Sequence, residues 1–212
     1  MSSARQEILQ RIAAAIDPPS AQQAVARNYR RAGALADEER IELFCRRVGE
    51  YRSEVHRVGE ADVATLISSI CGVRGVRTLV VPHGIPPAWR SADVQLVDDR
   101  ALSALELDGV DGTLTGCTAA IAETGTIVLT ASPHEGRRAL TLVPDLHICV
   151  VRESQIVELL PEALARVTTD RLEQQPITLV SGPSATSDIE LSRVEGVHGP
   201  RTLVVLVVKE PQ

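Results

Sequence analysis

The order of apolar and polar positions along the chain predicts strands and helices in alternation. Residues 78–82 form a short apolar run, which is typical of a strand buried in a parallel sheet. Similar runs predict further strands at 94–97, 126–130, 139–143, 147–151, 177–180 and 202–208. Helical spacing of apolar residues predicts helices over 37–48, from about Glu60 to Ile70, and over 101–105. This alternation predicts an α/β domain with a mostly parallel sheet.

The first 36 residues have a different pattern. Apolar side chains recur at helical spacing at Ile8, Leu9, Ile12 and Ile16, and two prolines then end the helix. Residues 20–36 show no firm periodicity. We therefore expect an N-terminal helical arm and linker over 1–36 and the α/β domain over 37–212. The arm can dock on a partner or fold back on its own domain, and the sequence favours neither.

Composition and charge narrow the possible partners. The chain has 212 residues, a formal net charge of −6 and only 2% aromatic residues. Binding to nucleic acid requires clustered Lys and Arg together with aromatic stacking surfaces, so a nucleic-acid partner is not expected. The polar N-terminus and the lack of a long apolar run predict a cytoplasmic protein without membrane insertion.

The four cysteines, Cys45, Cys71, Cys117 and Cys149, lie far apart in the sequence. Structural zinc sites and iron–sulfur clusters usually use closely spaced cysteine pairs, which this chain lacks. We therefore expect no metal site and no cluster in this chain, and interpret the cysteines as small buried apolar residues.

Small residues crowd the segment from Thr115 to Leu129, which contains Gly116 and the motif Glu123-Thr124-Gly125-Thr126. Small residues let backbone amides approach a ligand closely, so Gly116, Thr124, Gly125 and Thr126 are candidate ligand-binding residues. The Glu123 carboxylate could act as a nucleophile, a general base or a hydrogen-bond acceptor. Alternatively, Glu123 caps neighbouring amides in a simple turn.

A second polar segment follows the predicted strand at 177–180. It contains the candidate ligand-binding residues Ser181, Gly182, Pro183, Ser184, Thr186, Asp188 and Glu190. A strand, a glycine loop and the start of a helix would place free N–H groups and hydroxyls around a phosphate or carboxylate. Asp188 and Glu190 could instead cap these amides and exclude an anion, or face a cation or a hydroxyl.

Two arginines and two histidines complete the candidate site. Arg137 and Arg138 are adjacent and could hold an anion through their guanidinium groups. His147 begins a predicted strand and His198 precedes Gly199-Pro200, so either could transfer a proton near neutral pH. A solvated arginine pair and structural histidines are the simpler alternatives.

Four motifs together resemble the lactate utilization protein C (LutC/YkgG) family, which has a LUD domain. They are Ile121-Ala122-Glu123-Thr124-Gly125-Thr126, Leu142-Val143-Pro144-Asp145-Leu146-His147, Ser181-Gly182-Pro183-Ser184 with Asp188-Ile189-Glu190, and Gly196-Val197-His198-Gly199-Pro200. The resemblance covers about residues 38–208. It implies a three-layer α/β/α fold like that of the NagB/RpiA/CoA-transferase group, with an N-terminal helical extension.

The resemblance also implies a system that oxidises L-lactate to pyruvate, in which iron–sulfur clusters belong to partner subunits. The leading hypothesis is a non-redox subunit that binds a small anionic ligand and assembles with those iron–sulfur subunits. Two alternatives stay open. One is a CoA-transferase or isomerase-like enzyme that uses Glu123, and the other is a regulatory or scaffolding subunit. A homo-oligomer is compatible with each.

Overall fold

The computed structural model describes residues 4–15, 28–169, 175–186, 194–195 and 198–210. Its α-helices are α1 (Ala4–Ala15), α2 (Asp37–Glu50), α3 (Val63–Arg74), α4 (Ala104–Asp108) and α5 (Leu160–Thr169). The 3-10 helices are η1 (Glu60–Asp62), η2 (Pro87–Trp89), η3 (Arg138–Thr141) and η4 (Glu153–Gln155). The strands are β1 (Glu54–Gly59), β2 (Thr78–Val81), β3 (Gln95–Asp98), β4 (Gly112–Thr115), β5 (Ala119–Ile121), β6 (Thr126–Leu129), β7 (Leu146–Arg152), β8 (Ile156–Val157), β9 (Thr178–Val180), β10 (Ala185–Thr186), β11 (Val194–Glu195) and β12 (Thr202–Lys209).

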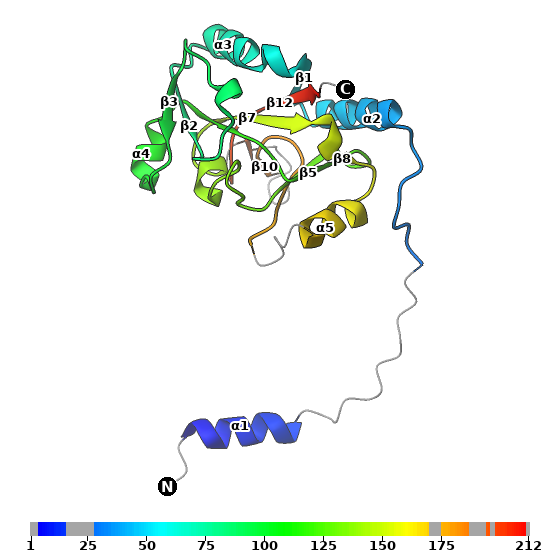
Figure 1. Ribbon diagram of the computed structural model, residues 1–212. Helices are drawn as coiled ribbons and strands as arrows, with labels where there is room; N and C mark the ends of the chain where they lie inside the picture. Colours follow the sequence, from blue (N-terminus) through cyan, green and yellow to red (C-terminus); the bar gives the residue numbers. More distant parts are fainter. Residues whose placement is uncertain (1–3, 16–27, 170–174, 187–193, 196–197, 211–212) are drawn as a thin grey trace.

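A six-stranded parallel sheet forms the centre of the domain (Figure 1). Its strand order is β1-β12-β7-β4-β2-β3, and every neighbouring pair is parallel. The last strand of the chain, β12, lies between β1 and β7, with Leu203 opposite His147. The predicted α/β fold class with a mostly parallel sheet is therefore confirmed.

The packing of strand β12 explains why its sequence is a continuous run of apolar residues. Val204, Leu206 and Val208 pack with α3 on one face, while Leu203, Val205 and Val207 pack with α2 on the other. Helix α2 begins with three acidic residues, which suit the positive end of its dipole, and buries Ile41, Phe44 and Val48. Because both faces are covered, apolar residues occupy every position of the strand interior.

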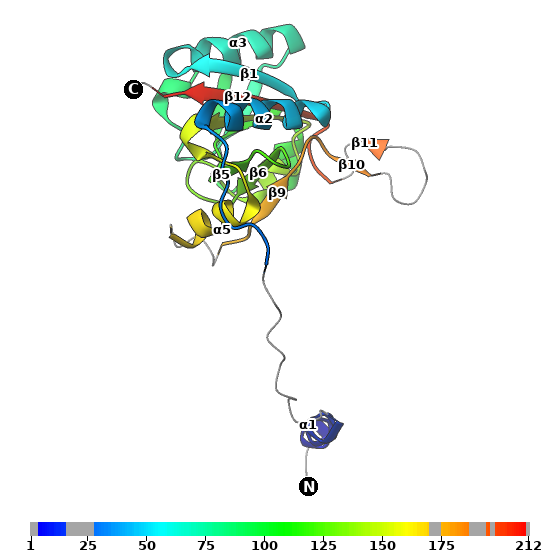
Figure 2. The same cartoon turned by 90° about the vertical axis from the view of Figure 1, so that its right-hand side faces the viewer.

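A second sheet was not predicted. Its strand order is β8-β5-β6-β9, and β5, β6 and β8 share the core with α2 (Figure 2). Helix α5 covers its outer side through Ala163 and Val167. The segment before residue 126, interpreted from sequence as a loop, thus contains β5, which pairs with β6 in an antiparallel hairpin.

Several other predictions need correction. The apolar run at 139–143 is not a strand, because Leu140 is buried against Val80 and Leu107 while the backbone closes 3-10 hydrogen bonds in η3. Strands β1 and β4 and helix α5 were not predicted at all. The predicted helix at 101–105 lies three residues later, as α4, because Ser103 caps it through the backbone N–H of Glu106.

Residues 28–36, which we call the N-terminal strap, are attached to the domain rather than loosely tethered. The backbone N–H groups of Ala34 and Leu35 donate to Glu158 Oε2 at 2.6 and 2.8 Å. Gly33 N donates to Glu162 Oε1 at 3.2 Å. The predicted helix of the arm is present as α1, and all of its residues are exposed.

Candidate anion-binding site

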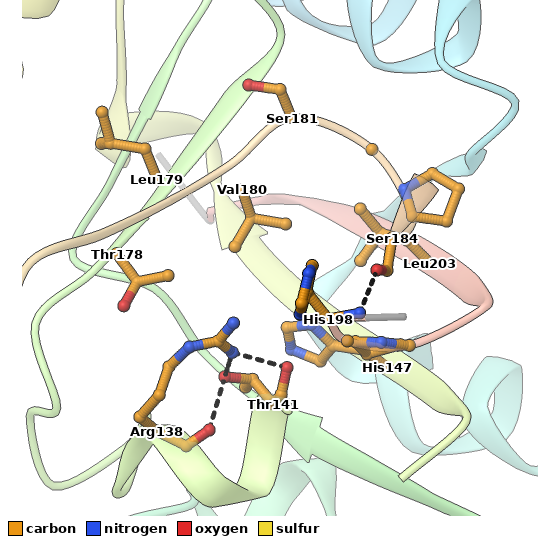
Figure 3. A pocket seen from close by; sticks show the side chains of 14 residues that line it. Arg138, Thr141, His147, Thr178, Leu179, Val180, Ser181, Ser184, His198 and Leu203 are labelled. Atoms are coloured by element: carbon orange, nitrogen blue, oxygen red, sulfur yellow. Dashed lines mark hydrogen bonds between the residues drawn. The ribbon is translucent and has the colours of Figure 1, made fainter. Parts of the chain in front are cut away.

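A cavity of about 240 Å³ lies beside the loop that follows β9 (Figure 3). It gathers residues that are distant in the sequence, since η3, β7, the 181–184 loop and the start of β12 all contribute to its wall. The predicted site residues in this wall are Arg138, His147, Ser181, Gly182, Pro183, Ser184 and His198. The remaining wall residues are Thr141, Thr178, Leu179, Val180, Gly199, Pro200 and Leu203.

The position of the cavity in the fold is unusual for an open parallel sheet. His147 is the second residue of β7 and Leu203 the second residue of β12, so the cavity lies at the amino ends of these strands. Ligands of open α/β sheets usually bind at the carboxyl ends. Here β9 and the loop after it line the cavity beside these amino ends.

The predicted helix start after the 181–184 loop is not there. Ala185 and Thr186 form β10, which pairs with β11. A helix dipole therefore does not contribute to this cavity at residues 185–186. Asp188 and Glu190, which were also predicted to bind ligand, lie outside the described residues.

Arg138 gives the cavity its positive charge. Its Nη1 donates to the carbonyl oxygen of Thr141 at 2.7 Å and to Thr141 Oγ1 at 2.8 Å, which fixes the guanidinium against η3. Burial lowers the pKa of Arg138, and no carboxylate among the described residues forms an ion pair with it. The described part of the cavity wall contains no Asp or Glu, so this charge remains available to an anion there.

His147 is almost fully buried, with an exposed fraction of 2%. Its Nε2 lies 2.8 Å from Thr115 Oγ1, on the neighbouring strand β4. Cys149 and Cys117 extend this buried polar cluster: the hydrogen bond with Cys149 raises the pKa of Cys117, and the hydrogen bonds with Cys117 and then His147 lower that of Cys149. The interior side of His147 is thus hydrogen-bonded to protein.

Hydroxyls and backbone groups hold the loop above the cavity in place. The backbone N–H of His198 donates to Ser184 Oγ at 3.0 Å, and Ser184 N donates to the carbonyl of Pro200 at 2.8 Å. Gly182 has a φ of +86°, and a Cβ added there would lie 2.5 Å from the Cβ of Tyr51. Glycine at 182 is therefore needed for the close approach of the loop to the end of α2.

The two predicted loops meet, but only one of them reaches the cavity. Thr126 Oγ1 lies 2.8 Å from Ser181 Oγ and Thr124 Oγ1 lies 2.7 Å from Thr126 Oγ1. Gly125 has a φ of +61°, and a Cβ there would lie 2.7 Å from the backbone carbon of Arg47. This loop is therefore packed against α2, with Thr126 as its link to the cavity loop.

Glu123 lies away from the cavity wall. Its carboxylate pairs with Arg30 of the N-terminal strap, in a separate hollow formed with Tyr29, Leu159, Leu160 and Pro161. Glu123 thus binds a side chain of its own chain, and its role toward a ligand stays a prediction.

Two further candidates have structural partners. Arg137 forms a two-pronged pair with Asp99, with Nε and Nη2 at 2.7 and 2.9 Å from the carboxylate, so its guanidinium is occupied. Gly116 is buried under His134, because a Cβ there would lie 2.6 Å from His134 Cδ2. Neither residue belongs to the cavity wall.

Sequence reasoning missed Thr141, Thr178 and Leu203 in the wall, because ordinary residues at the end of a 3-10 helix or the start of a strand carry no motif. It also passed over Glu135, which is 1% exposed and accepts hydrogen bonds from Thr130 N at 2.6 Å and Thr118 Oγ1 at 2.6 Å. The turn Ser132-Pro133-His134-Glu135-Gly136 was the available signal, since it places a carboxylate where backbone amides are free.

The described residues contain neither a cluster of metal ligands nor a membrane-spanning helix. No group of three or more His, Cys, Asp or Glu is arranged to hold a metal ion there. None of the described helices is long and apolar enough to span a membrane.

Comparisons with known proteins agree with the fold. A protein of Deinococcus radiodurans named lactate utilization protein C is 46% identical over 175 residues, which is 82% of each chain. The Escherichia coli protein YkgG is 26% identical over 209 residues, which cover 91% of this chain and 90% of that one. The crystal structure of a DUF162 family protein from Deinococcus radiodurans matches with a TM-score of 0.73 and 40% identity, over 82% of this chain and 99% of that chain.

A family model described as the LUD domain matches residues 41–208, which is most of the chain. The resemblance inferred from the four motifs is therefore confirmed, and the chain belongs to the LUD domain family, with lactate utilization protein C and YkgG among its relatives.

Proposed function

We propose that this chain is a LutC-like component of an L-lactate utilisation system and that its cavity binds a small carboxylic acid anion. In this role the chain is a non-redox subunit that assembles with iron–sulfur subunits. The relative named lactate utilization protein C supplies the metabolic context. The wall of the cavity supplies the chemistry.

The observation that carries the proposal is the charge of the cavity wall. Among the residues that the structure describes, Arg138, His147 and His198 are its ionisable side chains, and no described carboxylate accompanies them. A guanidinium in a partly dehydrated hollow attracts a carboxylate strongly, because charge-assisted hydrogen bonds contribute about 1.5–3 kcal/mol. The volume of about 240 Å³ is below the range of about 300–1,000 Å³ that suits drug-sized ligands. A short acid fits better than a nucleotide.

Assembly with iron–sulfur subunits is proposed for a separate reason. Oxidation of lactate to pyruvate releases two electrons, and the four cysteines of this chain lack the close spacing of a cluster site. Electrons would therefore leave through a partner that carries clusters, while this chain holds the small acid.

The alternative in which Glu123 attacks a thioester or abstracts a proton has less support. Glu123 pairs with Arg30 and lies outside the cavity wall, so a ligand held by Arg138 would not reach it without a rearrangement. No observation on this site favours catalysis by Glu123 over its role as a partner of the strap.

Calorimetry on the full chain tests the ligand. We expect L-lactate or pyruvate to bind, and lactamide, which has the same shape as lactate without the charge, not to bind. Equal heats from lactate and lactamide, or none from either acid, would contradict the proposal. Partner assembly is tested by purifying a tagged full-length chain from its own cells and measuring iron and acid-labile sulfide in the eluate, where their absence would argue against the assembly.

A further inference from the structure

The wall of the cavity has an apolar part beside its charged and hydroxyl groups. The wall residues with apolar side chains are Leu179, Val180, Pro183, Pro200 and Leu203. Lactate and pyruvate each have a single methyl group to place against such a surface, and one methyl group covers little of it. The apolar residues therefore suit a ligand with a longer carbon chain.

Val180 and Leu203 join this part of the wall to the core of the domain. Leu203 is buried in the core that β12 shares with α2, and Val180 packs against the same core. Val180 lies opposite Ile127 of β6, which also belongs to that core, so the Val180 side chain points from β9 toward the main sheet. Figure 3 shows it between the 181–184 loop and the Arg138 guanidinium. Because Val180 is only partly buried, part of its side chain is free to contact a ligand.

The volume of the cavity limits the length of that ligand. A water molecule, which has one non-hydrogen atom, occupies about 30 Å³ of the liquid. On this scale a cavity of about 240 Å³ holds about eight non-hydrogen atoms. Lactate and pyruvate have six such atoms, and pentanoate has seven. A three-carbon acid would therefore leave part of the cavity to water, next to apolar side chains.

We propose that the cavity selects monocarboxylic acids by the length of their carbon chain, and that about five carbons fit it better than three. The Arg138 guanidinium binds the carboxylate, and the carbon chain lies against Val180 and Leu203. This inference rests on the proposed binding of a small carboxylate in the same cavity, and it adds the class of acid that the cavity takes.

The dependence on length has a simple physical origin. Each methylene group that leaves water for an apolar wall strengthens binding about fourfold. The gain ends when the cavity is full, because further atoms stay in water or push against packed side chains. A cavity of limited size therefore gives an optimum length, whereas an open apolar surface gives a gain that continues with every added carbon.

Calorimetry on the full chain with acetate, propionate, butanoate, pentanoate and octanoate tests the proposal. We expect about fourfold tighter binding for each methylene up to pentanoate, and no further gain for octanoate. Equal affinity across the series would overturn the selection by length while leaving anion binding intact. A gain that continues to octanoate would also overturn it. No binding of any acid would overturn both this inference and the proposed function.

A larger side chain at Val180 tests the position of the carbon chain. Val180→Leu adds one methylene to the wall, so the best acid should become about one carbon shorter and pentanoate should bind about fourfold more weakly. Val55→Leu is the matched control, because Val55 on β1 is also partly buried and packs against the same core but is not among the described wall residues. It should keep the preference of the parent protein. An unchanged preference in Val180→Leu would overturn the assignment.

A polar side chain of the same shape tests the apolar contact itself. Val180→Thr replaces a methyl group with a hydroxyl, so the gain for each methylene should fall from about fourfold to about twofold. Affinity for acetate should stay within twofold, because its carboxylate still binds Arg138. An equal loss of affinity for acetate and pentanoate would overturn the contact, since it would show a general effect on the cavity.

Discussion

Two hollows on this domain differ in charge balance. The cavity between η3, β7 and the 181–184 loop contains an arginine and two histidines, and none of the described residues adds a carboxylate to its wall. The hollow at the N-terminal strap contains Glu123 and Arg30, which pair with each other. The first hollow has charge to offer a ligand, while the second has already used its charge within the chain. A carboxylate in a sequence motif, such as Glu123, is therefore available to a ligand only when no side chain of its own chain pairs with it.

The largest effect that we expect concerns the loop between the two hollows. Gly125→Ala should lower the free energy of unfolding by about 3 kcal/mol, because alanine at a φ of +61° is strained and its Cβ meets the backbone of α2. Urea denaturation measures this change. Gly49→Ala is the control, since a Cβ there meets no atom within 4 Å and should be neutral or stabilising within α2. An unchanged free energy of unfolding in Gly125→Ala would show that the packing of this loop against α2 does not hold the two hollows apart.

The next prediction tests whether the charge of Arg138 binds the anion. Arg138→Gln should weaken binding of a small acid about 30-fold, or about 2 kcal/mol, because the charge-assisted hydrogen bonds are lost. Arg137→Gln is the neighbouring control. Arg137 holds the pKa of Asp99 below its usual value, and its loss should reduce stability without changing affinity. Calorimetry measures the affinity of both variants for the acid, and urea denaturation measures their stability. A greater loss of affinity in Arg137→Gln than in Arg138→Gln would contradict the assignment of Arg138 as the anion-binding residue.

The attachment of the N-terminal strap to the domain should weaken at low pH. The backbone N–H of Leu35, followed by that of Ala34, lowers the pKa of Glu158 from its ordinary value of 4.5. A carboxylate with a lowered pKa stabilises the fold fully above its unfolded pKa, and that stabilisation is lost as the pH falls through the folded pKa. Detachment of the strap is therefore expected below pH 4.5.

NMR of the Leu35 amide between pH 7 and pH 3 measures this step. In Glu158→Gln the titration should disappear, at a cost of about 1 kcal/mol at pH 7. A Leu35 amide that does not titrate in the parent protein would contradict the role of Glu158.

The smallest effect belongs to Glu123. Glu123→Gln should change the free energy of unfolding by less than about 0.5 kcal/mol, because the two partners keep exposed side-chain fractions of 46% and 65%. Affinity for a small acid should stay within twofold of the parent protein. A loss of binding in this variant would return Glu123 to the functional site and remove the contrast between the two hollows.

The sequence predicted the continuously apolar strands well, and the strands rich in small or polar residues and the polar geometry poorly. Strand β12 was readable because its residues are apolar on both faces, and β7 because its core from His147 to Val151 is buried. Strand β4 was missed since Gly112-Thr113-Leu114-Thr115 has the composition of a turn, although tertiary packing buries all four residues. The run at 139–143 was wrong because apolar content alone does not separate a strand from a buried 3-10 turn.

The candidate site was predicted as a set of residues but not as an arrangement. Arg138, His147, His198 and the 181–184 loop were all singled out, and the structure brings them to one cavity. Adjacent residues were not separable from sequence: Arg137 and Arg138 look alike, yet only Arg137 has a carboxylate across the fold, at Asp99. The partner of Glu123 lies 93 positions away in the strap, beyond the reach of any local pattern.

The place of β12 in the sheet has a consequence for how the protein is made. This strand covers residues 202–209 and is the shared neighbour of β1 and β7, so β1 cannot join the sheet until residues 202–209 have left the ribosome. The wall of the cavity includes Leu203 at the start of the same strand. A chain truncated before residue 202 would therefore lose both the strand that joins β1 to the sheet and the Leu203 side of the cavity wall.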